Sequence, residues 1–209
     1  MVMPTRRRML AGLATVPFLP AGIALAASED SPRIFVAMAI VREEERETFE
    51  RFVEAVTPLW HRHAMAPRGR LSIMGGSEGL PLTDATVIEV ASDEGFSAYL
   101  ADPDYAPADA LRKRAAAWFA VADGPATKVD LPLEEGLWRL VIDGPRPRGV
   151  KRRTALVMGG DAPFRIGAAI GPLGPLQDAS RLRIERLTPD EDPHVDLPPE
   201  SFAWVGQQR

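Results

Sequence analysis

The nine residues RIFVAMAIV, at positions 33–41, constrain the fold more than any other stretch of the chain. Side chains alternate between two faces along a strand, and in this strand both faces are apolar. One face carries Ile34, Val36, Met38 and Ile40, and the other carries Phe35, Ala37, Ala39 and Val41. A strand that is apolar on both faces has to be covered on both. If helices pack on one face, a second layer must cover the other.

The segments that follow alternate between helix and strand. Residues 42–63 place an apolar stripe at helical spacing behind a Glu-rich first turn. Two segments have the pattern of strands, residues 70–76 and 84–92. A helix capped by Ser92 or Asp93 then runs through Leu100. A second helix, at 108–116, is followed by a strand at 118–124. The order βαββαβ predicts an α+β, ferredoxin-like domain over residues 33–124.

Residues 125–209 have a different texture, because proline and glycine interrupt short apolar runs. These runs have the length and composition of strands. We predict that residues 125–209 form a small β-rich C-terminal region, folded as an antiparallel sheet or sandwich. The alternative is that its strands extend or cap the sheet of the first domain.

The N-terminus has the pattern of an export signal. Arg6, Arg7 and Arg8 precede an apolar run that ends at an A-x-A site, residues 24–26. The order Thr-Arg-Arg-x-Met-Leu resembles the twin-arginine motif, and an ordinary secretory signal is the alternative. We therefore expect residues 1–26 to be a cleaved signal peptide, the twin-arginine translocase to be a partner during export, and the mature protein to be periplasmic or secreted. Prolines interrupt the apolar run, so no stable membrane anchor is expected.

Composition excludes several classes of function. The expected signal peptide carries three arginines and no acid, so its removal changes the net charge from −4 to −7, which argues against nucleic acid as a partner. The chain has no cysteine, which excludes disulfides, thiolate catalysis and cysteine-ligated metal sites. His61 and His63 point about 200° apart on a helix and cannot hold one ion together. No metal site is predicted.

The segment at residues 86–116 resembles the hallmark segment of domain-of-unknown-function family 1330, in the dimeric α/β-barrel superfamily. The matching positions are Ser92, Tyr99, Pro103-Asp104-Tyr105 and Leu111-Arg112. The chain departs from the family pattern at Pro67-Arg68, where a Gly-Gly run is usual, and at Asp102, where serine is usual. The resemblance implies a homodimer in which two sheets pack face to face, and it implies no agreed activity.

Two residues are candidate catalytic bases. His63 lies on the apolar stripe of its helix, and Glu89 shares a strand face with Val87, opposite the face expected under the helices. A carboxylate or imidazole in a cavity at that seam could accept a proton. The structural alternatives are a His63 bonded to a carbonyl at the helix end, and a Glu89 that is solvated or paired with Arg70.

Three further residues, Arg70, Tyr105 and Arg112, are candidates for binding a small, anionic molecule at the barrel mouth. The alternative for Tyr105 and Arg112 is a packing turn with a neighbouring salt bridge. Related dimeric barrels include cofactor-free monooxygenases and haem-degrading enzymes. The haem-degrading enzymes resemble one another through an Asn, a Trp and a His, and this chain has no asparagine. We expect no cofactor.

Three functions compete on this basis. The favoured one is an exported small-ligand-binding or accessory protein. The second is a cofactor-independent oxygenase or isomerase that works in the barrel cavity, and the third is a protein that docks another envelope component. A cavity lined by His63 and Glu89 would support the enzyme, whereas a filled barrel with both groups in salt bridges would support binding or docking.

Overall fold

The computed structural model describes residues 33–77, 79–144, 154–159, 164–188 and 201–208. The expected signal peptide, residues 1–26, lies outside these ranges, and the expectations of export and location stay predictions. The helices are α1 (Arg46–Arg62), α2 (Asp93–Ala101) and α3 (Tyr105–Ala115), with short 3₁₀ turns at Glu43–Glu45 and Gly174–Leu176. The strands are β1 (Arg33–Val41), β2 (Met65–Gly76), β3 (Asp84–Val90), β4 (Ala116–Val129), β5 (Leu137–Asp143), β6 (Thr154–Gly159), β7 (Arg165–Ile170), β8 (Arg181–Arg186) and β9 (Phe202–Gln208).

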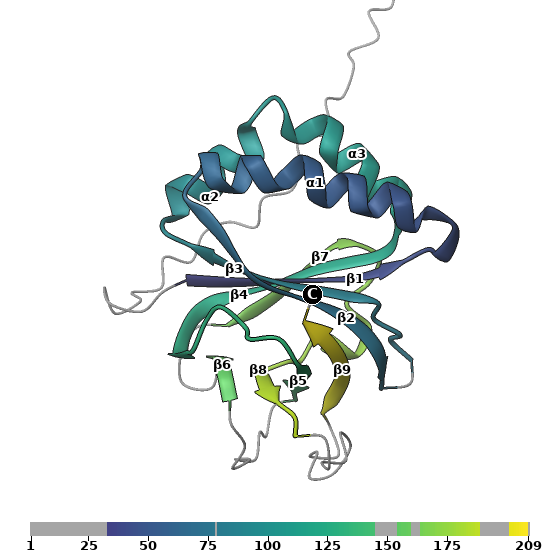
Figure 1. The fold of residues 1–209 in the computed structure, drawn as a ribbon, viewed down its shortest axis with the longest axis vertical. Coiled ribbons are helices and arrows are strands. Elements are labelled where there is room, and N and C mark those ends of the chain that lie inside the picture. Colours follow the sequence, from purple (N-terminus) through teal and green to yellow (C-terminus); the bar gives the residue numbers. More distant parts are fainter. Residues whose placement is uncertain (1–32, 78, 145–153, 160–163, 189–200, 209) are drawn as a thin grey trace, which may run out of the picture.

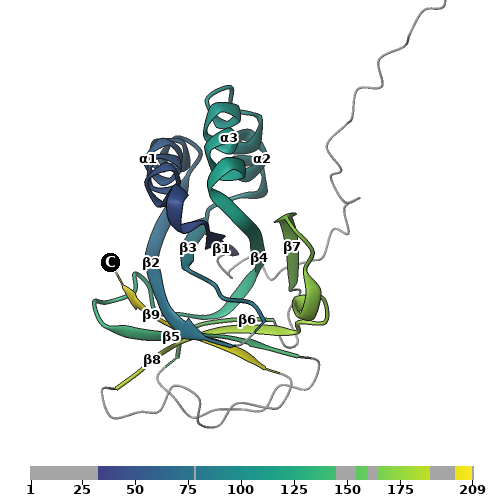
Figure 2. The same cartoon turned by 90° about the vertical axis from the view of Figure 1, so that its right-hand side faces the viewer.

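These strands form one antiparallel sheet that closes on itself. Its order is β1-β3-β2-β9-β5-β8-β6-β4, and β4 pairs with β1 to complete a ring of eight strands. The ninth strand, β7, pairs with β4 outside the ring. In Figures 1 and 2 the three helices lie together against the outer side of β1 to β4, while β5, β6, β8 and β9 form the opposite wall.

The predicted fold class, a ferredoxin-like βαββαβ domain followed by a small β-rich region, is wrong. The structure is a closed eight-stranded antiparallel barrel, in which β9 pairs with β2 and β6 pairs with β4. Strand β4 runs to Val129, through the expected boundary near residue 124, and so connects the two halves directly. The strands after residue 125 extend the first sheet, which is the alternative considered for them.

The barrel closes through the two pairs that join the halves, β2 with β9 and β4 with β6, and the second half repeats the strand order of the first. When β7, which lies outside the ring, is left out, the strands of each half lie in the order second, third, first, fourth: β2-β3-β1-β4 and then β6-β8-β5-β9. The chain therefore supplies both covers that the doubly apolar β1 requires. The expected homodimer stays a prediction, but the bare face that motivated it is covered by the chain's own strands.

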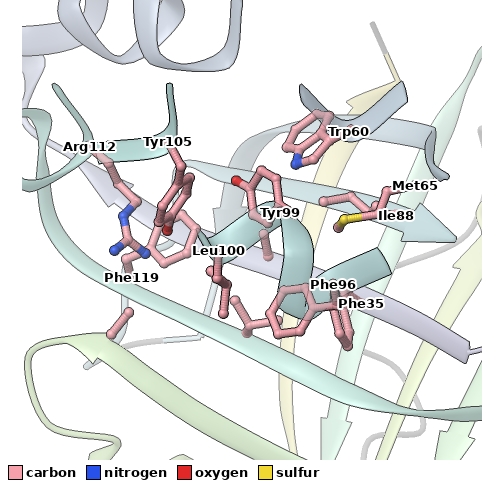
Figure 3. A pocket seen from close by; sticks show the side chains of 13 residues that line it. Phe35, Trp60, Met65, Ile88, Phe96, Tyr99, Leu100, Tyr105, Arg112 and Phe119 are labelled. Carbon is pink, nitrogen blue, oxygen red and sulfur yellow. The ribbon is translucent and has the colours of Figure 1, made fainter. Parts of the chain in front are cut away.

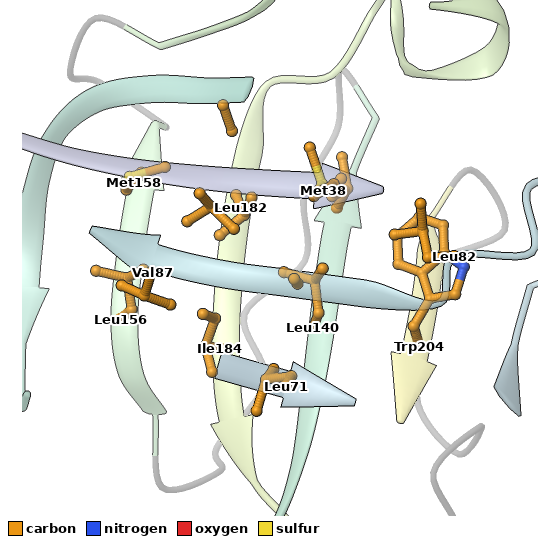
Figure 4. Packing of buried hydrophobic residues seen from close by; sticks show 14 of the residues in the cluster. Met38, Leu71, Leu82, Val87, Leu140, Leu156, Met158, Leu182, Ile184 and Trp204 are labelled. Carbon is orange, nitrogen blue, oxygen red and sulfur yellow. The ribbon is translucent and has the colours of Figure 1, made fainter. Parts of the chain in front are cut away.

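Two apolar cores result, one on each face of β1. Ile34, Val36 and Met38 point into the barrel, where they pack on residues of the opposite wall such as Leu140, Leu156, Leu182 and Ile184. Figure 4 shows Met38 of β1 and the side chains of the opposite wall, such as Leu140, Leu182 and Ile184, in the space between the two crossing walls. The other face of β1, with Phe35, Ala39 and Val41, packs under the helices.

The helices form where the sequence pattern predicts them, within a few residues. Helix α1 buries Phe49, Phe52, Val56, Leu59 and Trp60, whose spacing places them on one side of the helix. Helix α2 is capped as expected, since the Ser92 hydroxyl accepts a hydrogen bond from the Gly95 backbone N–H at 3.1 Å. None of the helices in the described ranges has the length and apolarity to cross a bilayer.

Candidate functional site

A pocket of about 280 Å³ lies between the helices and the outer face of the sheet, not inside the barrel. Its wall is formed by residues of the three helices and of strands β1 to β4. Ala169 of β7 also lines the pocket. Six of the thirteen lining residues are aromatic: Phe35, Trp60, Phe96, Tyr99, Tyr105 and Phe119 (Figure 3). An apolar cleft with few polar groups is typical of a small-molecule site.

The aromatic rings contact one another and so hold the shape of the pocket. Phe35 on β1 meets Phe96 on α2 edge to face, with ring centroids 4.4 Å apart. Tyr99 and Tyr105, on successive helices, have centroids 4.8 Å apart. Such pairs contribute about 0.5–1.5 kcal/mol beyond the area that they bury. The lining is therefore formed largely before any ligand arrives.

Arg112 is the cation in the pocket wall, and it is only 8% exposed. Its guanidinium stacks over the Phe119 ring at 4.6 Å, and its Nη2 donates to Asp109 one turn earlier on α3. Its Nε–H is buried and has no hydrogen-bond partner. Leaving a buried donor unpaired costs about 1–3 kcal/mol. After a small shift of the Arg112 side chain, an acceptor oxygen from a ligand would remove that cost.

Tyr99 offers a second donor. Tyr99 and Trp60 both line the pocket, and a neutral phenol can donate its O–H proton to a ligand. Burial is the largest cause that raises the pKa of Tyr99, and nearby Tyr105 raises it further. Burial also raises the pKa of Tyr105, and nearby Asp109 raises it further. Both side chains are therefore neutral phenols at neutral pH.

The structure brings only some of the predicted site residues together. Tyr105 and Arg112 share the wall of this pocket. Arg70 lies elsewhere, under α1, where it donates to Glu50 at 2.6 and 2.8 Å and to Asp84 at 3.1 Å. Whether any of these residues binds a ligand stays a prediction.

The two candidate bases lie outside the pocket wall and are both paired. Glu89 accepts from Arg68 at 2.6 Å, not from Arg70. The Nε2 of His63 lies 2.7 Å from an oxygen of Asp102. This bond, with a backbone N–H from Asp104 and the Arg62 guanidinium, lowers the pKa of Asp102 to about 2. Since side chains also fill the barrel, the observations match the outcome expected for binding or docking.

Sequence reasoning missed Tyr99, Trp60 and Phe96 as lining residues. Trp60 was interpreted as a core residue, and it is buried, yet one side of its ring borders the pocket. The sequence did contain a signal for Tyr99. It lies three residues before the turn at Asp102, and the predicted site residue Tyr105 lies three residues after the same turn. In the described part of the chain, no group of three or more His, Asp or Glu side chains is placed to hold a metal ion.

Fold and site together define a closed antiparallel barrel with a small-molecule-sized pocket on its helix-covered side. No protein-family model matches the chain, and no curated protein matches it. Solved structures share the fold. A candidate monooxygenase from Fusobacterium nucleatum aligns with a TM-score of 0.50 and 11% identity, over 85% of this chain and 92% of that one. An anthrone oxidase-like protein aligns with a TM-score of 0.50 and 9% identity, over 87% and 92% of the two chains.

Proposed function

We propose that this protein binds a small, flat, largely apolar molecule that carries an acceptor oxygen, in the pocket between the helices and the sheet. The observation that carries the proposal is the buried Arg112, whose Nε–H lacks a partner beside a wall of aromatic rings. The neutral Tyr99 hydroxyl adds a second donor group to the same wall. Aromatic walls favour a planar ring system, and N–H and O–H donors in the wall favour a carbonyl or phenolic oxygen over a purely hydrocarbon ligand.

Anthrone is a suitable probe, because it is a three-ring ketone and the name of one structural neighbour contains it. Its matched control is 9,10-dihydroanthracene, which has the same rings without the carbonyl. We expect anthrone to quench tryptophan fluorescence on binding, with at least tenfold higher affinity than the hydrocarbon. A hydrogen bond to a charged group is worth about 1.5–3 kcal/mol, which is roughly ten- to a hundredfold in affinity.

Two variants test whether Arg112 and Tyr99 cause the preference for anthrone over 9,10-dihydroanthracene. Arg112→Lys keeps the charge but loses the Nε–H, and Tyr99→Phe loses the hydroxyl; each should weaken anthrone binding by about three- to tenfold or more and leave the hydrocarbon's affinity nearly unchanged. Arg114→Met, an exposed arginine on the same helix, is the control. Equal affinity for both probes, or anthrone binding that is unchanged in Arg112→Lys, would contradict the proposal.

A second candidate function is oxidation of such a ligand by O₂ without a cofactor. The fold shared with the candidate monooxygenase and the anthrone oxidase-like protein favours it. The reaction on a ring CH₂ beside the conjugated system is CH₂ + O₂ → C=O + H₂O, and it needs a base to remove a ring proton. The pocket wall supplies no ready base, since the pKa values of Tyr99 and Tyr105 are both raised. Oxygen uptake with anthrone above the uncatalysed rate would establish that the protein oxidises it. Without such uptake, ligand binding alone would be the supported function.

The export route, the envelope location and a homodimer accompany this proposal as predictions. A ligand-binding protein in the envelope suits the twin-arginine-like N-terminus and the absence of cysteine. Docking to another envelope protein remains an alternative role.

A further inference from the structure

The end of helix α1 is joined to the turn between α2 and α3 through the buried side chain of Asp102. His63 directly follows α1, and its Nε2 lies 2.7 Å from Oδ2 of Asp102. The Asp102 side chain is only 4% exposed. At the same joint, a Cβ on Gly95 would lie 2.5 Å from the His63 carbonyl oxygen, so only glycine allows α2 to pack this closely on α1. The joint is therefore tightly packed as well as hydrogen-bonded.

Asp102 is the centre of the turn that carries both pocket tyrosines. Its backbone N–H donates to the carbonyl of Tyr99 at 3.3 Å, and its own carbonyl accepts from the Tyr105 N–H at 2.9 Å. Its second carboxylate oxygen accepts from the Asp104 N–H at 2.9 Å. A shift of Asp102 would thus move the ends of α2 and α3 from which Tyr99 and Tyr105 reach the pocket.

We infer that His63 is a positioning residue: by holding Asp102, it fixes the α2–α3 turn and so aims the Tyr99 hydroxyl at the ligand. This inference rests on the proposed function, because it concerns the same pocket. It gives His63 a role that does not require contact with a ligand or proton transfer. The ring of His63 also meets the ring of Tyr99 edge to face, with centroids 6.5 Å apart, which links the two residues directly.

A second side chain, Arg62, also bonds to Asp102, and it allows the effect of His63 to be distinguished from the effect of removing any positive or donor group near Asp102. Arg62 also donates to Oδ2 of Asp102, at 2.8 Å, and reaches Asp104, but its side chain is 52% exposed. Exposed ion pairs contribute about 0–1 kcal/mol. Arg62→Met therefore removes a half-exposed donor to the same oxygen, and it is the matched control for changes at His63.

The test compares His63→Phe, which keeps a ring but loses the donor, with His63→Gln, whose amide N–H can occupy the place of Nε2. We expect His63→Phe to weaken anthrone binding by about tenfold and to lower the ratio of anthrone to 9,10-dihydroanthracene affinity. In His63→Gln, the anthrone affinity and the affinity ratio should both stay within about threefold of the wild-type values. Arg62→Met should also change each of them by no more than about threefold. A purely structural loss would weaken both probes equally and leave the ratio unchanged.

A ligand-free measurement keeps the inference testable if anthrone does not bind at all. Amide hydrogen exchange at the N–H groups of Asp104 and Tyr105 should quicken by at least tenfold in His63→Phe and recover in His63→Gln. Failure of the wild-type protein to bind anthrone would count against the proposed function alone. Unchanged hydrogen exchange in His63→Phe would overturn the positioning role. If the wild type binds anthrone, an unchanged ratio of anthrone to 9,10-dihydroanthracene affinity in His63→Phe would overturn it as well.

Discussion

Replacing Trp204 with alanine is expected to lower the free energy of unfolding by about 3–5 kcal/mol. Trp204 lies on β9, is 1% exposed and donates its Nε1–H to the Leu80 carbonyl at 2.8 Å. Its strand pairs with β2 of the first half and with β5 of the second. The cavity left by the indole therefore lies where the two halves meet, and both should lose stability together.

Urea unfolding followed by far-ultraviolet circular dichroism and by fluorescence measures this effect. In a single closed barrel the two signals should change in one coincident transition, in the wild type and in Trp204→Ala. Phe202→Ala is the control, because Phe202 stacks on Trp204 with centroids 6.2 Å apart but is partly exposed, and it should cost less than half as much. Two separate transitions, with the helical signal unaffected by Trp204→Ala, would show that the halves fold independently.

The second large effect concerns a buried charge cluster on β5 and β8. Glu185 accepts from Arg139 on the neighbouring strand at 2.5 and 3.1 Å, and it also pairs with Arg183. Arg139 and Glu185 are both fully buried. We expect Glu185→Leu to destabilise the protein by about 3–5 kcal/mol, because it removes the carboxylate between two buried guanidinium groups.

A double variant tests whether the cost comes from the uncompensated charge. Arg139→Met together with Glu185→Leu removes both members of the pair, and Arg183 keeps its bonds to Asp143 at 2.9 and 3.0 Å. The double variant should be more stable than Glu185→Leu alone, since apolar replacements of a whole buried pair are often neutral or stabilising. A cost below about 1 kcal/mol for the single variant would mean that the cluster is more solvated than its burial indicates.

The sequence predicted the elements of the first half well, because each carries a strong local pattern. The two apolar faces of residues 33–41 also predicted that two layers must cover β1. The pattern could not tell whether the second layer comes from another subunit or from the same chain. Strands β5 to β9 are short, and the contacts that seat them, such as the pairing of β9 with β2 across the length of the chain, are not local.

The site was only partly predictable for the same reason. Tyr105 and Arg112 were found through a family resemblance, and both lie in the pocket wall. The orphaned Nε–H of Arg112 depends on how α3 sits over Phe119, and no sequence pattern encodes that contact. The position of Tyr99 depends on the turn at Asp102, which His63 reaches from a separate helix. His63 and Glu89 drew attention as ionisable groups in apolar segments, and both are paired.

Cysteine cross-linking tests the central claim most directly, because the natural chain has no cysteine to interfere. Ser72 on β2 faces Gln207 on β9, and Lys128 on β4 faces Val157 on β6, at the two seams where the halves join. Paired strand residues have Cα atoms about 4.5–5.5 Å apart, within the range of a disulfide. If one chain closes its own barrel, Ser72→Cys/Gln207→Cys and Lys128→Cys/Val157→Cys will each oxidise to a cross-linked single chain. Covalent dimers as the main product, or cysteines that stay reduced at both seams, would contradict it.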